Sequence, residues 1–186
     1  IYIGSTDFRA EIRAEDANPS HLEVYLDGEL KYNYTWITAE ETFKPNFTNL
    51  SEGSHTLVVI GYDLAGFNTT EEVTFFIDIT PPAINIVTPQ TGSFLNTTTV
   101  VVNWTYSDAS PTTFSIYLDG ELYLVNLVNT SLVLTDLAVG QHIVEVVATD
   151  AAGNNATVTT IFTIDLEPPI VSLSLIHISE PTRPRL

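Results

Sequence analysis

Hydrophobic and polar residues alternate with a period of two in several short segments of the chain. Residues 8–14 read Phe-Arg-Ala-Glu-Ile-Arg-Ala, and residues 100–106 continue the same alternation with larger apolar side chains. This period is typical of β-strands that bury one face, and no segment shows helical periodicity. The side chains that we predict to point inward are Phe8, Ala10, Ile12, Ala14, Leu22, Val24, Leu26, Leu57, Val59, Val73, Phe75, Ile77, Val100, Val102, Trp104, Tyr106, Phe114, Ile116, Leu118, Val144, Val146, Thr160, Phe162 and Ile164.

The second half of the chain repeats the first. Residues 24–30 read Val-Tyr-Leu-Asp-Gly-Glu-Leu and return 92 residues later as Ile-Tyr-Leu-Asp-Gly-Glu-Leu. Segments around Gly53, Tyr62 and Asp78 return at an offset of 87. A repeat of about 90 residues predicts two domains, 1–80 and 81–167, after which 168–172 open a third copy.

Turn signals separate the predicted strands. Asp27-Gly28 and its repeat equivalent Asp119-Gly120 are two-residue hairpin signals, because glycine accepts a positive φ. Proline pairs end each copy, and proline there fixes φ and predicts a short, stiff joint. About seven short strands per copy, with turns every 8 to 12 residues, predict an all-β protein of two β-sandwiches.

The motifs shared by both copies resemble a known class of module. They are Gly-X-His, then Asp-X-Ala-Gly-Asn or a near variant, then Phe-X-Ile-Asp-X-X-Pro-Pro, with Phe67 replacing the motif's asparagine in the first copy. This pattern resembles the immunoglobulin-like repeats of prokaryotic (archaeal or bacterial) cell-surface proteins. The resemblance implies two tandem immunoglobulin-like β-sandwich domains of about seven antiparallel strands each.

The charge balance argues against two classes of partner. The chain carries 23 Asp and Glu against 6 Lys and Arg, a formal net charge of −17. Nucleic acid and anionic lipid headgroups both require basic surfaces, so we expect neither nucleic-acid binding nor direct membrane insertion. Cysteine is absent, which excludes disulfides and thiolate metal sites from the fold.

Asparagine indicates the compartment. Eight of the twelve asparagines stand in Asn-X-Ser/Thr, an excess over chance that predicts an extracellular, glycosylated surface. The alternative is that Asn and Thr are simply common in turns and strands. The glycosylation candidates are Asn33, Asn46, Asn49, Asn68, Asn96, Asn103, Asn129 and Asn155.

The two ends of the chain differ from the modules. The sequence begins with Ile1, without an initiator methionine, which indicates an internal piece of a longer protein. Residues 173–186 depart from the expected third copy and resemble a translated transposase-type sequencing adapter through Arg183. We predict that this tail is not native and exclude it from the fold.

No catalytic constellation is predicted, and we expect no enzyme activity. His55 and His142 recur at one repeat position, where a structural role such as capping or edge packing is favoured over catalysis. Neither a nucleophile elbow, a phosphate-binding glycine loop nor a His-Glu-X-X-His pattern occurs.

No cofactor is predicted, although calcium is a candidate ligand of the aspartates near the module ends. Calcium prefers several carboxylate oxygens, and an ion between tandem sandwiches would stiffen the joint. The same aspartates are also ordinary turn formers, so no metal-ligand set is assigned. These repeat-equivalent residues are Asp16 and Asp108, Asp63 and Asp150, and Asp78 and Asp165.

The expected function is that of non-catalytic spacer modules in a glycosylated extracellular cell-surface protein, as in a stalk, surface layer or adhesin arm. The expected partners are neighbouring repeats of the same chain and, for an adhesive variant, cell-surface glycans or proteins. One alternative is an adhesion or carbohydrate-binding module with an aromatic platform of Tyr25, Tyr117 and Tyr123. Another is an accessory region of a secreted enzyme whose catalytic domain lies elsewhere.

Overall fold

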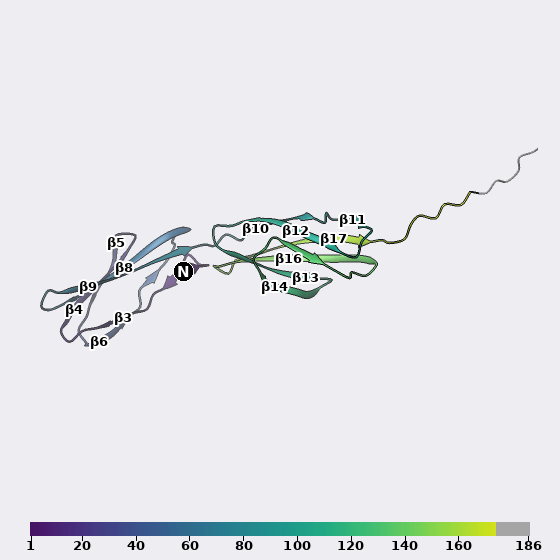
Figure 1. Ribbon diagram of the computed structural model, residues 1–186. Coiled ribbons are helices and arrows are strands. Elements are labelled where there is room, and N and C mark those ends of the chain that lie inside the picture. The colour runs from purple at the N-terminus through teal and green to yellow at the C-terminus, as the bar shows by residue number, and fades with distance from the viewer. Residues whose placement is uncertain (174–186) are drawn as a thin grey trace, which may run out of the picture.

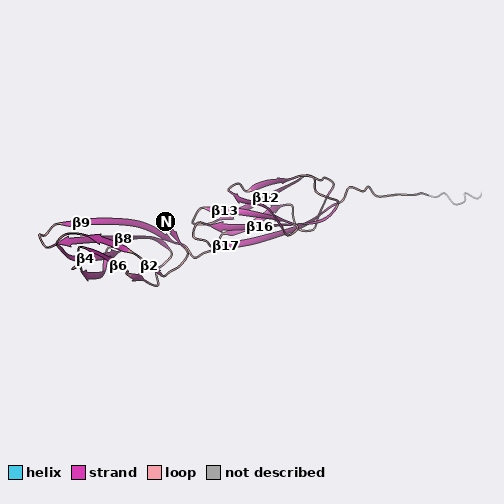
Figure 2. Ribbon diagram, turned by 90° about the horizontal axis from the view of Figure 1, so that it is seen from below, coloured by secondary structure: helices cyan, strands magenta, loops and turns pink. Residues whose placement is uncertain are grey.

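The computed structural model describes residues 1–173 and is built from strands and loops. Two modules lie end to end, module 1 (residues 1–80) and module 2 (residues 81–167), as Figures 1 and 2 show. The residues of the adapter-like tail from 174 onward lie outside the described part. No helix occurs among residues 1–173, and thus none there has the length and apolarity to cross a membrane.

Module 1 has one main sheet, of strand order β1-β9-β8-β4-β5. Facing it are two short strand pairs, β2–β7 and β3–β6, which the backbone bond from Ala10 N to Pro45 O (3.0 Å) connects. The strands are β1 (Tyr2–Ile3), β2 (Phe8–Arg9), β3 (Ile12–Glu15), β4 (Pro19–Leu26), β5 (Glu29–Thr35), β6 (Glu40–Phe43), β7 (Asn46–Phe47), β8 (Gly53–Asp63) and β9 (Asn68–Ile77).

Module 2 repeats this architecture with a more complete second sheet. Its main sheet has the order β11-β17-β16-β13-β14, and its second sheet has the order β10-β12-β15. The strands are β10 (Ala83–Thr88), β11 (Ser93–Leu95), β12 (Val100–Ser107), β13 (Thr112–Leu118), β14 (Glu121–Leu127), β15 (Ser131–Leu134), β16 (Gly140–Asp150) and β17 (Asn155–Ile164). The all-β prediction is confirmed, with one difference from an antiparallel fold: β1 and β11 run parallel to the last strand of their module.

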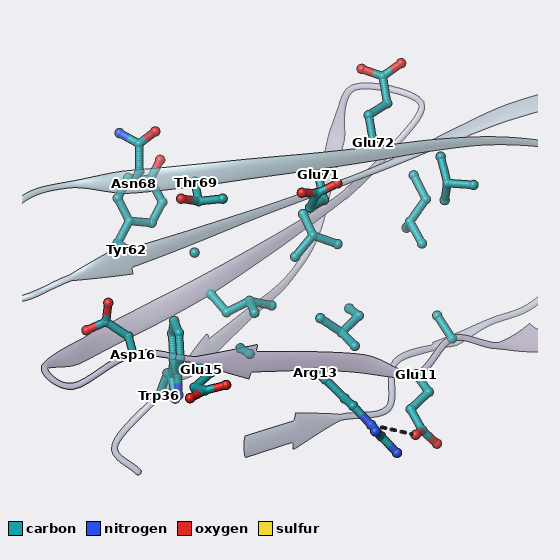
Figure 3. A pocket seen from close by; sticks show the side chains of 18 of the residues that line it. Glu11, Arg13, Glu15, Asp16, Trp36, Tyr62, Asn68, Thr69, Glu71 and Glu72 are labelled. Atoms are coloured by element: carbon teal, nitrogen blue, oxygen red, sulfur yellow. Dashed lines mark ion pairs between the residues drawn. The ribbon is translucent and has the colours of Figure 1, made fainter. Parts of the chain in front are cut away.

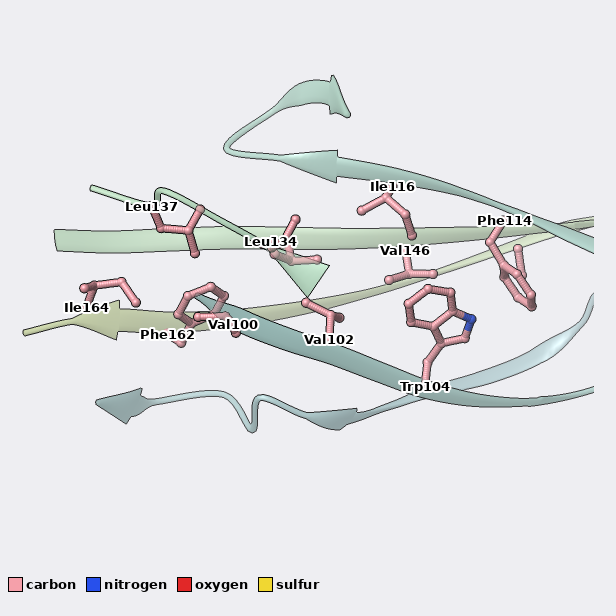
Figure 4. Packing of buried hydrophobic residues seen from close by; sticks show 12 residues of the cluster. Val100, Val102, Trp104, Phe114, Ile116, Leu134, Leu137, Val146, Phe162 and Ile164 are labelled. Carbon is pink, nitrogen blue, oxygen red and sulfur yellow. The ribbon is translucent and has the colours of Figure 1, made fainter. Parts of the chain in front are cut away.

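Each module has its own core, because alternate residues of both sheets point into the space between them. In module 2 the core is continuous from Trp104 to Ile164 (Figure 4). Two inward predictions are wrong. Tyr106 is 41% exposed at the end of β12, where its ring packs edge-on against Phe114, and Val73 of β9 is 40% exposed.

The core of module 1 is built around a different tryptophan. Module 2 places Trp104 on β12, whereas module 1 has Ile12 at that position and buries Trp36 instead, just after β5. The Trp36 ring lies 3.4 Å from where a Cβ of Gly61 would stand, at the position that Ala148 fills in module 2. Gly61 on β8 thus leaves room for the ring of Trp36, which follows β5 at the edge of the same sheet.

The hairpin signals are confirmed. Asp27 and Gly28 connect β4 to β5 with φ of 53° and 81°, and Asp119 and Gly120 connect β13 to β14 with φ of 52° and 85°. Two consecutive positive φ values define a type I′ turn, whose twist matches that of the flanking strands. The aspartate tolerates this backbone and leaves its carboxylate free for a second role described below.

Candidate functional site

The joint between the modules is a five-residue linker, 78–82, that is held from both sides. On the module 1 side, the Glu52 carboxylate accepts hydrogen bonds from the backbone N–H of Ile79 (2.9 Å) and from the Thr80 hydroxyl (2.7 Å). The Thr80 hydroxyl and the Ile79 N–H hold the pKa of Glu52 below its usual value. Pro81 and Pro82 then fix φ immediately before β10 begins.

Module 2 contacts the joint through the turn between β16 and β17. Asn154 donates from Nδ2 to the carbonyl oxygen of Asp78 (2.8 Å), a contact across 76 positions of the chain. Gly4 of module 1 packs so closely on the same turn that a Cβ there would lie 2.5 Å from the carbonyl oxygen of Ala152. Comparison of the two copies could not predict this role of Asn154, because module 1 has Phe67 at the equivalent position.

Three aspartates meet at this joint. Ligand oxygens of Asp78, Asp108 and Asp150 all lie within 4.8 Å of one another. Asp108 accepts hydrogen bonds from the Ser110 N–H and hydroxyl, and Asp150 accepts them from the backbone of its own turn. Oxygen Oδ2 of Asp78 is buried and has no hydrogen-bond partner.

Of the six aspartates considered as calcium candidates, the structure gathers only these three within residues 1–173. Asp16 and Asp63, the repeat equivalents of Asp108 and Asp150, accept backbone bonds at the opposite end of module 1. Asp165, equivalent to Asp78, accepts a bond from the Glu167 N–H. Sequence spacing alone could not distinguish the gathered set, because each of its aspartates makes the same kind of local turn as its repeat equivalent.

The repeated histidines brace the hairpins. His55 Nδ1 lies 2.7 Å from the Asp27 carboxylate and Nε2 lies 2.8 Å from the Ser51 carbonyl oxygen. His142 makes the same two contacts, with Asp119 (2.8 Å) and the Ala138 carbonyl oxygen (2.9 Å). Both rings are buried, which agrees with the predicted structural role.

The two braces favour the protonated imidazole, because both ring nitrogens face acceptors. The Ser51 carbonyl and then Asp27 raise the pKa of His55 against the opposing effect of burial. Burial lowers the pKa of His142, but the Ala138 carbonyl and Asp119 outweigh it and the pKa is raised. For Asp27, burial is outweighed by His55 and the Thr56 N–H, so that its pKa is lowered.

A groove of about 660 Å³ opens along module 1, between β3 and β9. Its floor is apolar and its rim carries charged side chains, including the Arg13–Glu11 ion pair (3.6 Å) drawn in Figure 3. Residues of the groove floor are Ile3, Phe8, Ala10, Ile12, Ala14, Leu22, Trp36, Leu57, Val59, Val73 and Phe75.

The groove exists because β3 has no partner on its outer edge among the described residues. In module 2 the equivalent edge, on β12, pairs with β10, whose Ile84 and Ile86 pack on the core. Thr160, the repeat equivalent of Val73, is consequently only 2% exposed and donates to the Pro89 carbonyl oxygen (2.8 Å). Sequence alternation identifies the inward residues of module 1 but not whether a neighbouring strand covers them.

Seven of the eight glycosylation candidates are exposed: Asn33, Asn46, Asn49, Asn68, Asn96, Asn129 and Asn155. Asn103 differs, since it is half-buried on β12 and its Nδ2 donates to the Thr88 hydroxyl oxygen (3.1 Å). A glycan there would have to replace this bond. Asn68 and Asn155 both begin the last strand of their module.

The three tyrosines of the considered aromatic platform belong to different environments. Tyr25 and Tyr117 are half-buried at equivalent positions of separate modules, and the Tyr25 hydroxyl donates to the Glu23 carboxylate (2.8 Å). Tyr123 is exposed on the edge strand β14.

Comparison with known proteins identifies the fold. No protein-family model matches the chain, and no curated protein matches its sequence. Among solved structures, the chain is similar to the fibronectin(III)-like modules of Clostridium thermocellum CbhA, with 15% identity over 92% of this chain and 93% of that chain and a TM-score of 0.55. Murine CEACAM1b (9% identity, 88% and 96% coverage) and a 1.5-MDa bacterial ice-binding adhesin (20%, 87% and 58%) align less well, with TM-scores of 0.49 and 0.45.

The chain therefore has the fold of tandem immunoglobulin-like or fibronectin-III-like β-sandwiches, as predicted.

Proposed function

We propose that this chain is a non-catalytic spacer segment of an extracellular, glycosylated cell-surface protein. The observation that carries the proposal is the joint, which is braced from module 1 by Glu52 and from module 2 by Asn154. Domains of one chain move independently by default when their interface is small. Specific contacts on both sides of the joint therefore indicate a stiff connection and not a flexible tether. Two sandwiches held end to end span a greater distance than two sandwiches that move freely about the joint.

The surface supports an extracellular setting. Exposed Asn-X-Ser/Thr sites occur on both modules, and the acidic surface disfavours nucleic acid and anionic membranes as partners. The resemblance of the shared motifs to repeats of prokaryotic cell-surface proteins supports a prokaryotic source. The fibronectin(III)-like modules of CbhA have the same tandem β-sandwich architecture. In this role the partners of each module are the neighbouring modules of the same chain.

NMR relaxation of the intact chain tests the spacer role. We expect both modules to report one common rotational diffusion tensor, because the joint couples them. Two independent correlation times would overturn the proposal.

The rival adhesion role predicts a ligand. Protein produced without glycans should bind no member of a glycan array if it is a spacer. Saturable binding that is lost on Tyr123→Ala, while Tyr25→Ala retains it, would instead assign an adhesive surface to β14 of module 2.

A further inference from the structure

We infer that Asp78, Asp108 and Asp150 form a calcium site between the two modules. Their ligand oxygens converge within 4.8 Å, although each residue comes from a different segment: the linker, the loop after β12 and the end of β16. The Asp78 side chain supplies an independent indication. It is only 3% exposed, and its Oδ2 is enclosed without any hydrogen-bond donor.

A buried carboxylate oxygen without a donor is costly, and two further carboxylates beside it add repulsion. A divalent cation removes both costs at once, because it serves as the missing partner and balances the charge. The cluster contains only oxygen ligands, and hard oxygen ligands select calcium or magnesium over zinc or copper. Calcium accepts an irregular set completed by water or carbonyl groups, whereas magnesium demands a near-octahedral one.

The repeat explains why the site requires two modules. Asp108 and Asp150 lie on the end of module 2 that faces module 1, and Asp78 belongs to the strand exit of module 1. Asp16 and Asp63 are their repeat equivalents in module 1, but among residues 1–173 these two belong to no cluster of three acidic residues. The ion would thus bind only where one module follows another, and it would lock the joint.

Calcium titration of the intact, chelator-treated chain tests this site. We expect isothermal titration calorimetry to give one ion per chain, with a dissociation constant on the order of 0.1–1 mM, typical of extracellular modules. About 5 mM calcium should raise the Tm by roughly 3–6 °C relative to EGTA. Asp78→Asn keeps the shape of the side chain and should abolish both signals.

Asp165→Asn is the matched control, since it changes the same repeat position where no cluster forms, and it should bind calcium as the wild type does. Asp108→Asn, at a partly exposed loop position, replaces Asp78→Asn if the latter fails to fold. Absence of calcium binding by the wild type, or equal loss in Asp165→Asn, would overturn the site. A larger Tm shift with magnesium than with calcium would also contradict it.

Discussion

Val73 in module 1 and Thr160 in module 2 occupy the same position of the repeat, yet the first is 40% exposed and the second is 2% exposed. Their own strands, β9 and β17, are equally long and pair with their neighbours in the same way. The difference comes from β10 and the residue that follows it: Thr160 donates to the carbonyl oxygen of Pro89, and this segment has no counterpart over Val73 among the described residues. Two copies of one pattern therefore differ in burial because of a single edge strand.

The comparison separates two sources of stability. The alternating pattern defines the inward face in both modules. Within residues 1–173, however, β12 of module 2 pairs on both sides, with β10 and β15, whereas its equivalent β3 in module 1 pairs with β6 alone. The hydrophobic contribution to stability scales with the apolar area removed from water. The inward residues of module 1 that stay partly exposed therefore stabilise it less than their buried equivalents stabilise module 2. The chain also has one tryptophan in each core, Trp36 and Trp104, which lets the two modules be followed separately.

The largest expected effect is on the closed core. Trp104→Ala should cost about 3–5 kcal/mol of the unfolding free energy of module 2, because it empties a core without room to collapse. Trp36→Ala, which borders the open groove, should cost roughly half as much in module 1. Urea unfolding followed by circular dichroism measures both, with the remaining tryptophan reporting the unchanged module. Equal costs would show that the groove does not weaken the core of module 1.

Adding an equivalent of β10 to module 1 should remove the difference in burial between Val73 and Thr160. A copy of residues 81–92 placed before Ile1 supplies the equivalent of β10, and we expect it to stabilise module 1 by about 2–4 kcal/mol through buried isoleucine side chains. The Trp36 fluorescence midpoint in urea reports this gain. The same insert with aspartate in place of both isoleucines should give none, and a gain with that control would rule out strand insertion.

A smaller effect concerns pH and should be common to both modules. His55 and His142 have folded-state pKa values above the ordinary 6.5. Their stabilisation is therefore complete below about pH 6.5 and is lost as the pH rises through the folded-state values. His55→Gln and His142→Gln should each flatten the decline in the urea midpoint of its own module between pH 6 and 8.5, where pH changes the charge of histidine. An unchanged decline in the double variant would assign it to other groups.

At the acid end, module 1 should respond through Asp27. Its lowered pKa means that its contribution is present above the unfolded value, near 3.8, and disappears as the pH falls through the folded value. Asp27→Asn should reduce the acid sensitivity of module 1, measured by Trp36 fluorescence, and leave that of module 2 unchanged.

The smallest expected effect on stability is at the joint. Gly4→Ala would place a methyl group against the Ala152 carbonyl, so the turn must move away. We expect a change below about 1 kcal/mol in either module, together with separate NMR correlation times for the two modules. Thr6→Ala is the neighbouring control and should leave the modules coupled.

The repeat and the alternation predicted much of this fold from the sequence. They identified the buried positions of β4, β8 and β16, the Asp-Gly turns and the structural role of His55 and His142, because these depend on local patterns. The exposure of Val73 was missed because it depends on which segment covers the residue, and that of Tyr106 because the residue lies near the end of β12. The gathering of Asp78 with Asp108 and Asp150 depends on how two modules meet, which local spacing does not encode.

One topological detail determines how the molecule responds to tension. In each module a short early strand runs parallel to the last one, β1 beside β9 and β11 beside β17. In module 2, pulling the chain at both ends draws β11 and β17 in opposite directions along their shared length. Their hydrogen bonds are then loaded together in shear instead of being opened one at a time like a zipper. The strand pairing that closes the sandwich is also the element that would carry a pulling load.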